Sequence, residues 1–489
     1  MKSRLIDQVA TGVAWSVAEK LCSMLLQMVV SIVVARLLVP EDFGVMAILT
    51  FFTAVALVVV DSGFSQTLLR KQEPTNDDYK SVFTFNLAVS LVLYLLLIAL
   101  SPLLAQYYDL AIISKIAPVL FLLLPLNALG IIQNTKLSRE FRFGVISRIN
   151  FVASLVAGAT AIVVAVCGGG VWALVAQRLT QMATRSLLLW WRGNWRGEGS
   201  FSGSAWREMA PFSFRLMSTD IVAAVYNNVA QLFIGKIYSA DTLGYFNQAQ
   251  KIKDLPVQSA VLSVQSVTYP ALAKIKDDTA KFAESFRKVL LINVFVMTPI
   301  AVGMSAVAEP LFRVLLGEKW LPTVPYFEII ALAGIFYPLS MVAYNVLKVH
   351  SNGAIIFRLE LLKKAIMTAV LALTIPYSTM AIAYGLVAMT AVEFVVNFAA
   401  TRRYTALSWW QMIRTLLPSL LLTAVMYVTV KAVGYYTVDF TPIRQLLLQI
   451  ATGVAVYALG AWICRLEALK EFVSTIKGVL IIERLGIRK

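Results

Sequence analysis

The sequence carries one short run twice, two hundred positions apart. Residues 35–44 read ARLLVPEDFG and residues 235–244 read GKIYSADTLG, with a cation, an acid and a closing glycine at equivalent positions. Each run ends a long apolar segment that has polar residues on one side, and another apolar segment follows it. The repeat predicts a chain built from two related halves, and membrane transporters place their substrate sites between such halves.

The composition indicates that these apolar segments cross a membrane. The chain is 59% hydrophobic and 14% charged, with a mean hydropathy of +0.76. Soluble domains average about 45–50% apolar and about 25% charged residues. The apolar runs reach about 20 residues, which is the length of a spanning helix and too long for barrel strands. The sequence therefore predicts an all-α integral membrane protein with about 14 transmembrane helices.

The predicted spans form two equivalent groups and a C-terminal extension. About six spans in each group give pseudo-symmetric lobes, followed by two further helices. The linker between the lobes is rich in glycine and serine, which predicts a flexible cytoplasmic hinge, and the tail has the apolar spacing of an amphipathic helix. The predicted parts are 1–192 for the N-terminal lobe, 193–206 for the linker, 207–403 for the C-terminal lobe, 404–465 for the two further helices and 466–489 for the cytoplasmic tail.

Lysine and arginine are concentrated in alternate loops and in both tails. With a cytoplasmic N-terminus, the cytoplasmic side carries several times more of them than the opposite side, as the positive-inside rule requires. We therefore expect both termini in the cytoplasm. The net charge of +16 is then a topology signal, and no nucleic-acid partner is expected.

The sequence lacks several signatures of enzymes and of metal-binding or secreted proteins. It has no P-loop pattern and no loop long enough to hold a soluble catalytic domain, and no cleavable signal peptide is expected. Cys22, Cys167 and Cys464 are far apart in or beside spans, which argues against a disulfide or a metal cluster. The only histidine, His350, falls in a predicted cytoplasmic loop. We therefore expect no catalytic residues, no metal and no cofactor.

Lys20 lies deep in the first predicted span. A charge in mid-membrane costs about 2.5–3.5 kcal/mol, so such a residue faces a cavity, meets a counter-ion or reaches an interface. Ser16, Ser23 and Gln27 fall on the same helical face as Lys20. This stripe predicts the lining of a cavity; neutralisation of Lys20 by Glu19 or another acid is the alternative.

A second polar stripe lies on the eighth predicted span. It includes Lys251 and Gln258, while Lys253 points away from it. Asp254 on this stripe either faces the cavity or is a structural partner for Lys251. We expect Lys251 and Gln258 to contact substrate.

The seventh predicted span, adjacent in the repeat, is polar as well. Asp220, Asn227 and Gln231 share one of its faces, and Arg215 lies near its cytoplasmic end. Asn227, Gln231 and Arg215 are therefore further candidates for substrate contacts. A solvated helix start explains Arg215 almost as well.

The sixth predicted span places Arg178, Gln181 and Arg185 on one side. Arg178 is a candidate for substrate binding, whereas Arg185 is expected to anchor the inner interface. The balance of charge inside the spans is cationic, which favours an anionic substrate.

Two stretches of the chain carry motifs of a known family. They are AWS, EK, VARLL and PEDFG between residues 14 and 44, and GYF, a lysine, DLP and YPAL between residues 244 and 272. In these the chain resembles the Wzx-type polysaccharide flippases of the multidrug/oligosaccharidyl-lipid/polysaccharide exporter superfamily. The resemblance implies two six-helix lobes around a V-shaped cationic cavity. It also implies transfer of undecaprenyl-pyrophosphate-linked oligosaccharides across a bacterial inner membrane, and Lys20 and Lys251 match positions that are usually basic in the family.

The residues and the resemblance together predict a lipid-linked oligosaccharide flippase that works by alternating access. It would serve the biosynthesis of a surface polysaccharide such as a lipopolysaccharide or exopolysaccharide. Lys20 and Lys251, with Arg215 and Arg178, would hold the pyrophosphate, and polar residues on the same stripes would contact the sugar. Expected partners are the lipid-linked substrate, the membrane, and the polymerase and glycosyltransferases of the pathway.

Three acids are candidates for coupling transport to a proton or a sodium ion. They are Asp61, Glu19 and Asp220, and an ordinary structural role is the stronger interpretation of each. The alternative functions are a multidrug-type exporter, which cavity acids would favour, and a membrane polymerase or glycosyltransferase, which needs a large outer loop or paired catalytic acids. A scaffold without transport would not need intramembrane cations.

Overall fold

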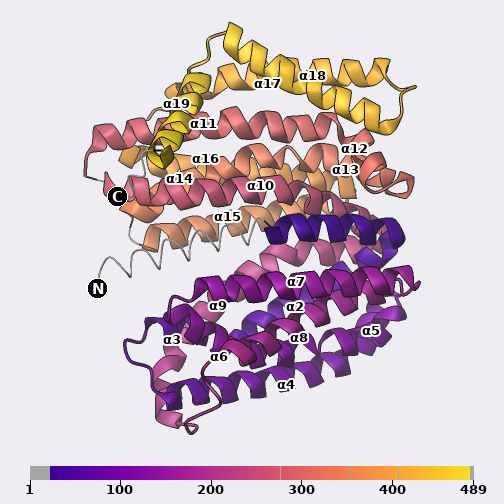
Figure 1. The fold of residues 1–489 in the computed structure, drawn as a ribbon, viewed down its shortest axis with the longest axis vertical. Coiled ribbons are helices and arrows are strands. Elements are labelled where there is room, and N and C mark those ends of the chain that lie inside the picture. Colours follow the sequence, from indigo (N-terminus) through magenta and orange to yellow (C-terminus); the bar gives the residue numbers. More distant parts are fainter. Residues whose placement is uncertain (1–21, 276, 352, 406, 485–489) are drawn as a thin grey trace. The chain divides into compact units, whose positions relative to one another are not determined.

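The computed structural model describes residues 22–275, 277–351, 353–405 and 407–484. Within these ranges the chain is helical, without β-strands (Figure 1). Eight described helices are long and apolar enough to cross a membrane, and the bent pair Glu318–Ile330 with Ala333–His350 makes a ninth if it is one span. The protein is thus an all-α, multi-pass membrane protein, and the total of about 14 spans stays a prediction.

The chain divides into two compact units between Asn247 and Gln248, inside α10 (Ala240–Lys274). The first unit holds the helix Cys22–Leu37, α2 (Pro40–Asp61), α3 (Phe64–Arg70), α4 (Asn76–Tyr108), α5 (Ile112–Leu120), α6 (Leu123–Arg139), α7 (Phe143–Val166), α8 (Trp172–Arg192), α9 (Gly203–Ile237) and the start of α10. The second holds the rest of α10, α11 (Thr279–Ala306), α12 (Ala308–Leu315), η1 (Glu318–Thr323), α13 (Val324–Ile330), α14 (Ala333–His350), α15 (Gly353–Thr374), α16 (Thr379–Thr405), α17 (Trp409–Tyr436), α18 (Pro442–Ile463) and α19 (Glu467–Arg484).

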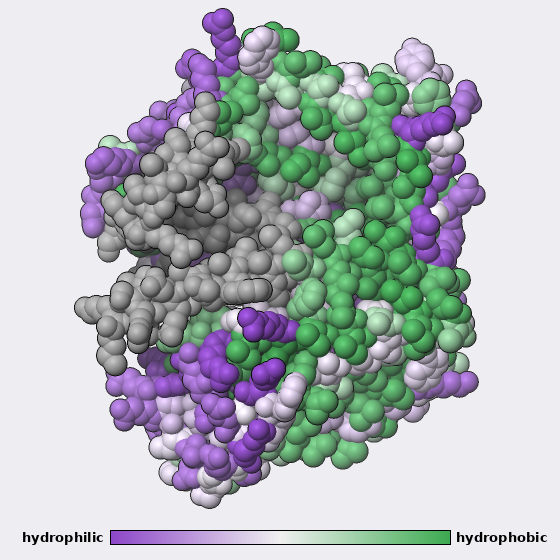
Figure 2. Space-filling view, in the orientation of Figure 1, coloured by the Kyte–Doolittle hydropathy of each residue, from purple (hydrophilic) through white to green (hydrophobic). Residues whose placement is uncertain are grey.

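Local sequence determines where the helices begin and end. The Thr75 hydroxyl accepts from the Asp78 amide, and the Asp78 carboxylate accepts from the Thr75 amide at 2.8 Å, so both residues cap the start of α4. Ser62 and Gly63 both have positive φ and interrupt the apolar run between α2 and α3. Between such ends, apolar side chains cover the helices and hydrophilic side chains gather towards the helix ends (Figure 2).

The repeated runs found in the sequence lie directly against each other. A Cβ atom on Gly44 would lie 1.8 Å from the Ala240 carbonyl oxygen, and one on Gly244 would lie 2.0 Å from the Pro40 carbonyl oxygen. The two contacts are reciprocal, because Pro40 and Ala240 begin α2 and α10 at equivalent positions of the repeat. Glycine is required at both positions because the opposing backbones leave no room for a side chain.

The glycine- and serine-rich linker is fixed to the first unit, so the expectation of a flexible hinge is wrong. The Trp195 side chain is fully buried, and the Ser202 amide donates to Ser81 Oγ at 2.8 Å. The Ser200 amide donates to Asp77 Oδ1 at 2.7 Å. Gly199 has a φ of +96°, and a Cβ there would lie 2.5 Å from a backbone oxygen of α4. The glycine supplies an unusual backbone conformation and a close approach, and the hydrogen bonds remove the freedom that the composition suggested.

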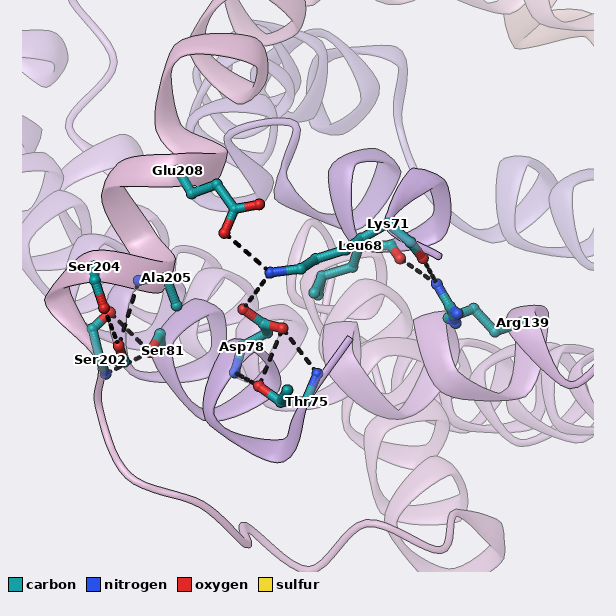
Figure 3. A network of polar contacts seen from close by, with 10 residues as sticks. All are labelled: Leu68, Lys71, Thr75, Asp78, Ser81, Arg139, Ser202, Ser204, Ala205 and Glu208. Carbon is teal, nitrogen blue, oxygen red and sulfur yellow. Dashed lines mark hydrogen bonds and ion pairs between the residues drawn. The ribbon is translucent and has the colours of Figure 1, made fainter. Parts of the chain in front are cut away.

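A polar network beside the linker joins the ends of four helices, α3, α4, α6 and α9 (Figure 3). Lys71 Nζ lies 3.0 Å from Asp78 Oδ1 at the start of α4 and 3.2 Å from Glu208 Oε2 near the start of α9. Arg139, at the end of α6, donates to the Leu68 carbonyl oxygen of α3 at 2.6 Å. The start of α9 is therefore tied to the helices that precede the linker.

The C-terminal tail forms the helix α19, which packs on the second unit. Phe472 lies 5.9 Å from Phe295 between ring centroids, in a cluster that also includes Leu469. Arg287 donates to both carboxylate oxygens of Glu467, and this contact lowers the pKa of Glu467. Part of the apolar face predicted for the membrane surface thus covers the protein's own core.

Candidate functional site

A cavity of about 710 Å³ lies within the first unit, among the helix Cys22–Leu37, α2, α6, α7 and α8. Its polar lining residues are Ser23, Gln27, Thr50, Thr53, Asn150, Ser154, Arg178, Gln181 and Arg185. Its apolar lining residues are Met24, Met46, Ala54, Leu57, Leu123, Ala153 and Met182. The volume lies within the range of about 300–1,000 Å³ that is typical of ligand pockets.

Two arginines of α8 give this cavity a positive charge. Arg178 and Arg185 are seven positions apart, about two helical turns, so both project from one face of α8. No acidic residue is among the described lining residues, and no ion pair of either arginine is found in the described part of the chain. A cavity whose described charged lining residues are all cations suits an anion. The planar guanidinium suits phosphate in particular, because it can donate two parallel hydrogen bonds.

Neutral polar groups hold Arg185 in place without cancelling its charge. Its Nε donates to Asn150 Oδ1 at 3.1 Å, and its second terminal nitrogen lies 3.2 Å from Asn134 Oδ1. Gln181 donates to Ser154 Oγ at 3.4 Å, which joins α8 to α7. Arg178 makes no such contact with an amide and is exposed to the cavity. The site therefore contains Arg185, whose guanidinium is held by two asparagine side chains, and Arg178, which is accessible from the cavity. Several hydrogen-bonding side chains lie beside them.

The structure brings three of the predicted site residues together. Ser23, Gln27 and Arg178 line the cavity, as their helical spacing suggested. Arg185 lines it too, and its expected role as an interface anchor stays a prediction. Asn150 was missed, although it stands one turn before Ser154 on α7 and a polar pair at that spacing is a signal for a lining face. Ser16, Glu19 and Lys20 lie outside the described residues.

The predicted residues of α9 and α10 are not among the described lining residues of this cavity. Arg215, Asp220 and Asn227 are exposed on α9, and Gln231 is half-buried. Lys251 and Gln258 are exposed on the part of α10 that belongs to the second unit. Asp254 forms an ion pair with Lys253 at 2.7 Å, so Lys253 has a partner on its own helix. A role of these α9 and α10 residues in substrate binding stays a prediction.

Asp61 occupies the break between α2 and α3. Its carboxylate accepts a hydrogen bond from Ser65, and the next residue, Ser62, is in the left-handed region with φ of +49°. These contacts agree with a role at a helix end. Ion coupling by Asp61, Asp220 or Glu19 stays a prediction.

The second unit contains a charged cluster that the sequence analysis missed. Lys363 of α15 is only 4% exposed, and its Nζ lies 2.5 Å from Glu360 Oε1 and 3.4 Å from Glu393 Oε1 of α16. The ammonium also lies 5.4 Å from the centre of the Tyr344 ring. One buried cation thus holds two carboxylates from neighbouring helices together.

Replacing Lys363 with methionine is expected to lower the free energy of unfolding by about 1–3 kcal/mol, because it leaves two partly exposed carboxylates without their cation. Thermal unfolding of the purified protein in detergent measures this loss. Lys281→Met is the matched control, since Lys281 forms an ion pair at the surface with a side chain that is 75% exposed. Equal melting temperatures for the two variants would show that the cluster contributes no stability.

Comparisons with known proteins agree with this architecture. The family model described as "Polysaccharide biosynthesis protein" matches residues 33–325, more than half of the chain. The chain is 24% identical over 409 residues to the succinoglycan biosynthesis transport protein ExoT of Rhizobium meliloti, covering 83% of this chain and 80% of that protein. It is 23% identical over 336 residues to the teichuronic acid biosynthesis protein TuaB of Bacillus subtilis, covering 68% and 69%. The lipopolysaccharide biosynthesis protein WzxC of Escherichia coli is 23% identical over 368 residues, covering 73% of each.

Solved structures show the same fold at lower sequence identity. The lipid II flippase MurJ in an inward closed conformation superposes with a TM-score of 0.72 at 15% identity, covering 92% of this chain and 98% of that chain. An inward-facing multidrug resistance MATE transporter superposes with a TM-score of 0.61 at 16% identity, covering 78% and 94%. The fold is therefore shared by a lipid II flippase and a multidrug transporter, and the family match adds a place in polysaccharide biosynthesis. The chain belongs to the polysaccharide biosynthesis protein family.

Proposed function

We propose that this protein is a flippase that moves an undecaprenyl-pyrophosphate-linked oligosaccharide across the bacterial inner membrane during surface polysaccharide biosynthesis. The observation that carries the proposal is the cavity of the first unit, which holds Arg178 and Arg185 with no acid among its described lining residues. A pyrophosphate is the anionic part of such a substrate, and guanidinium groups bind it with charge-assisted hydrogen bonds. Family membership and the named biosynthesis relatives support a polysaccharide substrate.

The neutral polar groups of the cavity would contact the sugar. Gln27, Gln181 and Ser154 offer donors and acceptors next to the arginines, which suits hydroxyl groups. The prenyl chain would stay in the lipid, and alternating access would expose the cavity to each side in turn. We further propose about 14 spans, cytoplasmic termini, coupling to a proton or sodium ion, and operation beside a glycan polymerase and glycosyltransferases.

The second candidate function is export of small molecules, because the MATE transporter shares the fold. Cationic drugs need acidic groups in the cavity, whereas the charged lining residues described here are arginines. The chemistry of the cavity therefore favours the anionic, lipid-linked substrate.

Transport can be tested by deleting the gene in its native host. We expect the surface polysaccharide to be lost and lipid-linked oligosaccharide to accumulate on the inner leaflet, and both defects to be reversed by the wild-type gene. Radiolabelled lipid-linked sugars and surface glycan staining measure the two effects. Normal surface glycan together with increased sensitivity to cationic drugs would contradict the proposal and favour the exporter.

A further inference from the structure

A second polar cavity, of about 310 Å³, lies at one end of the second unit. It is lined by the end of α11, by α12, by the last turns of α17, by the loop that follows α17 and by the first turns of α18. Its polar lining residues are Glu309, Arg313, Lys431, Gln445 and Gln449. Both signs of charge are therefore present in one small cavity, unlike the purely cationic lining of the first unit's cavity.

The two cations of this cavity retain hydrogen-bond donors. Arg313 lies 2.9 Å from Glu309 Oε1 through one terminal nitrogen, and a guanidinium has five N–H donors in all. Lys431 Nζ lies 2.6 Å from Glu328 Oε1, which uses one of three ammonium donors. Donors on both side chains are left for an acceptor such as a phosphate oxygen.

One residue that lines the cavity has a buried acceptor that receives no hydrogen bond from the described residues. Gln449 is 3% exposed, and its Nε2 donates to the Val430 carbonyl oxygen at 3.4 Å. Its Oε1 has no donor in the described part of the chain. An amide oxygen left in this state costs about 1–3 kcal/mol, so a ligand with an N–H or O–H group gains by meeting it.

The rim of the cavity is apolar and aromatic. Tyr435 is 77% exposed, Val438 is 68% exposed and Phe440 is 51% exposed. Exposed aromatic side chains at the ends of apolar helices mark the membrane–water interface. Along α17, Leu421 and Val428 are also exposed and offer an apolar track from the cavity along the helix. A rim of this kind suits the headgroup region of a bilayer.

We propose that this cavity binds the headgroup of a zwitterionic phospholipid with a primary ammonium group. Arg313 and Lys431 donate to the phosphate, while Glu309 and Gln449 Oε1 accept from the ammonium. The acyl chains follow the exposed face of α17. An anionic headgroup fits less well, because three acids surround the two cations. Glu309 and Glu318 lie within 3.8 Å of Arg313, and Glu328 lies 2.6 Å from Lys431. A quaternary ammonium fits less well because it has no N–H donor for the amide oxygen.

Native mass spectrometry of the full chain released from nanodiscs tests this site. The nanodiscs contain equal parts of dioleoyl phosphatidylethanolamine, phosphatidylcholine and phosphatidylglycerol. We expect about ten times more phosphatidylethanolamine than either other lipid to remain bound to the released protein. One or two charge-assisted hydrogen bonds account for a difference of this size. Gln449→Leu and Glu309→Gln should each remove this preference. Glu309→Gln changes a side chain that is 63% exposed, so it keeps the test valid if Gln449→Leu does not fold.

Arg142→Gln is the matched control, because Arg142 forms a similar exposed ion pair with Glu140 in the first unit. The control should keep the lipid preference of the wild type. Equal retention of the three lipids by the wild type would overturn the proposal, and so would preferential retention of phosphatidylglycerol. Thermal unfolding in the presence of maltose, at about 10 mM, tests a sugar as the ligand. If maltose raises the melting temperature of the wild type but not of Gln449→Leu, and lipid retention is the same in both, the cavity binds a sugar instead.

Discussion

Replacing Gly44 with alanine is expected to destabilise the folded protein by about 3 kcal/mol, at the upper end of the range for overpacked sites. The added Cβ would lie 1.8 Å from the Ala240 carbonyl oxygen, and the obstructing atom belongs to backbone that cannot rotate away. The starts of α2 and α10 would have to separate. Gly244→Ala should have the same effect, since its Cβ would lie 2.0 Å from the Pro40 carbonyl oxygen. Membrane levels and thermal unfolding in detergent measure both losses.

Gly144→Ala provides the control for this prediction. Gly144 lies in α7, and a Cβ at this position would have no heavy atom within 4 Å. Alanine is favoured over glycine in a helix by about 0.5–1 kcal/mol, so this variant should be neutral or slightly more stable. A loss of stability in Gly44→Ala together with no loss in Gly144→Ala would show that the effect is steric and does not follow from any glycine-to-alanine substitution. Equal melting temperatures for Gly44→Ala and the wild type would show that the starts of α2 and α10 are not in contact.

Removing both arginines of the first unit's cavity is expected to abolish delivery of surface glycan. Arg178→Gln alone should reduce it at least about tenfold, the effect of losing one charge-assisted hydrogen bond to a phosphate. Arg178→Lys should retain part of the activity, because it keeps the charge and loses the bidentate geometry. The measurement is surface polysaccharide in a strain that lacks the gene, with the membrane level of each variant determined in parallel.

The position of Arg185 makes the comparison of single variants informative. Arg185 is braced by Asn150 and Asn134, so Asn150→Leu should weaken delivery by releasing Arg185 while leaving both charges in place. Arg142→Gln, which removes a cation outside the cavity, should deliver glycan normally. Normal glycan from the Arg178→Gln, Arg185→Gln double variant would remove the anion-binding mechanism.

The sequence predicted the class of fold and part of the cavity, for identifiable reasons. Ser23, Gln27 and Arg178 were found because helical spacing determines which residues share a face. The place of Arg185 in the cavity could not be predicted, because no sequence pattern shows where neighbouring helices leave a space. Lys363 was overlooked for the same reason: its burial depends on Glu393, which approaches from another helix.

The linker shows a different limit of sequence reasoning. Glycine and serine are common both in flexible chains and in tightly packed turns, so composition alone does not separate the two. Trp195 was the contrary signal, since a large aromatic residue in a linker gains from burial. The position of the serine partners on α4 could not be read from the sequence, because it depends on tertiary structure.

The reciprocal contact of Gly44 and Gly244 bears on the ancestry of the chain. Each copy of the run supplies one glycine and one carbonyl oxygen, so a half-length polypeptide with a single copy already contains both sides of the contact. Two such polypeptides could pair through it as an isologous homodimer, with the same patch on each subunit. Gene duplication and fusion would then have joined the subunits while preserving this pairing. After fusion each glycine still faces the other copy's backbone, so neither position is free to diverge even where the rest of the two runs has done so.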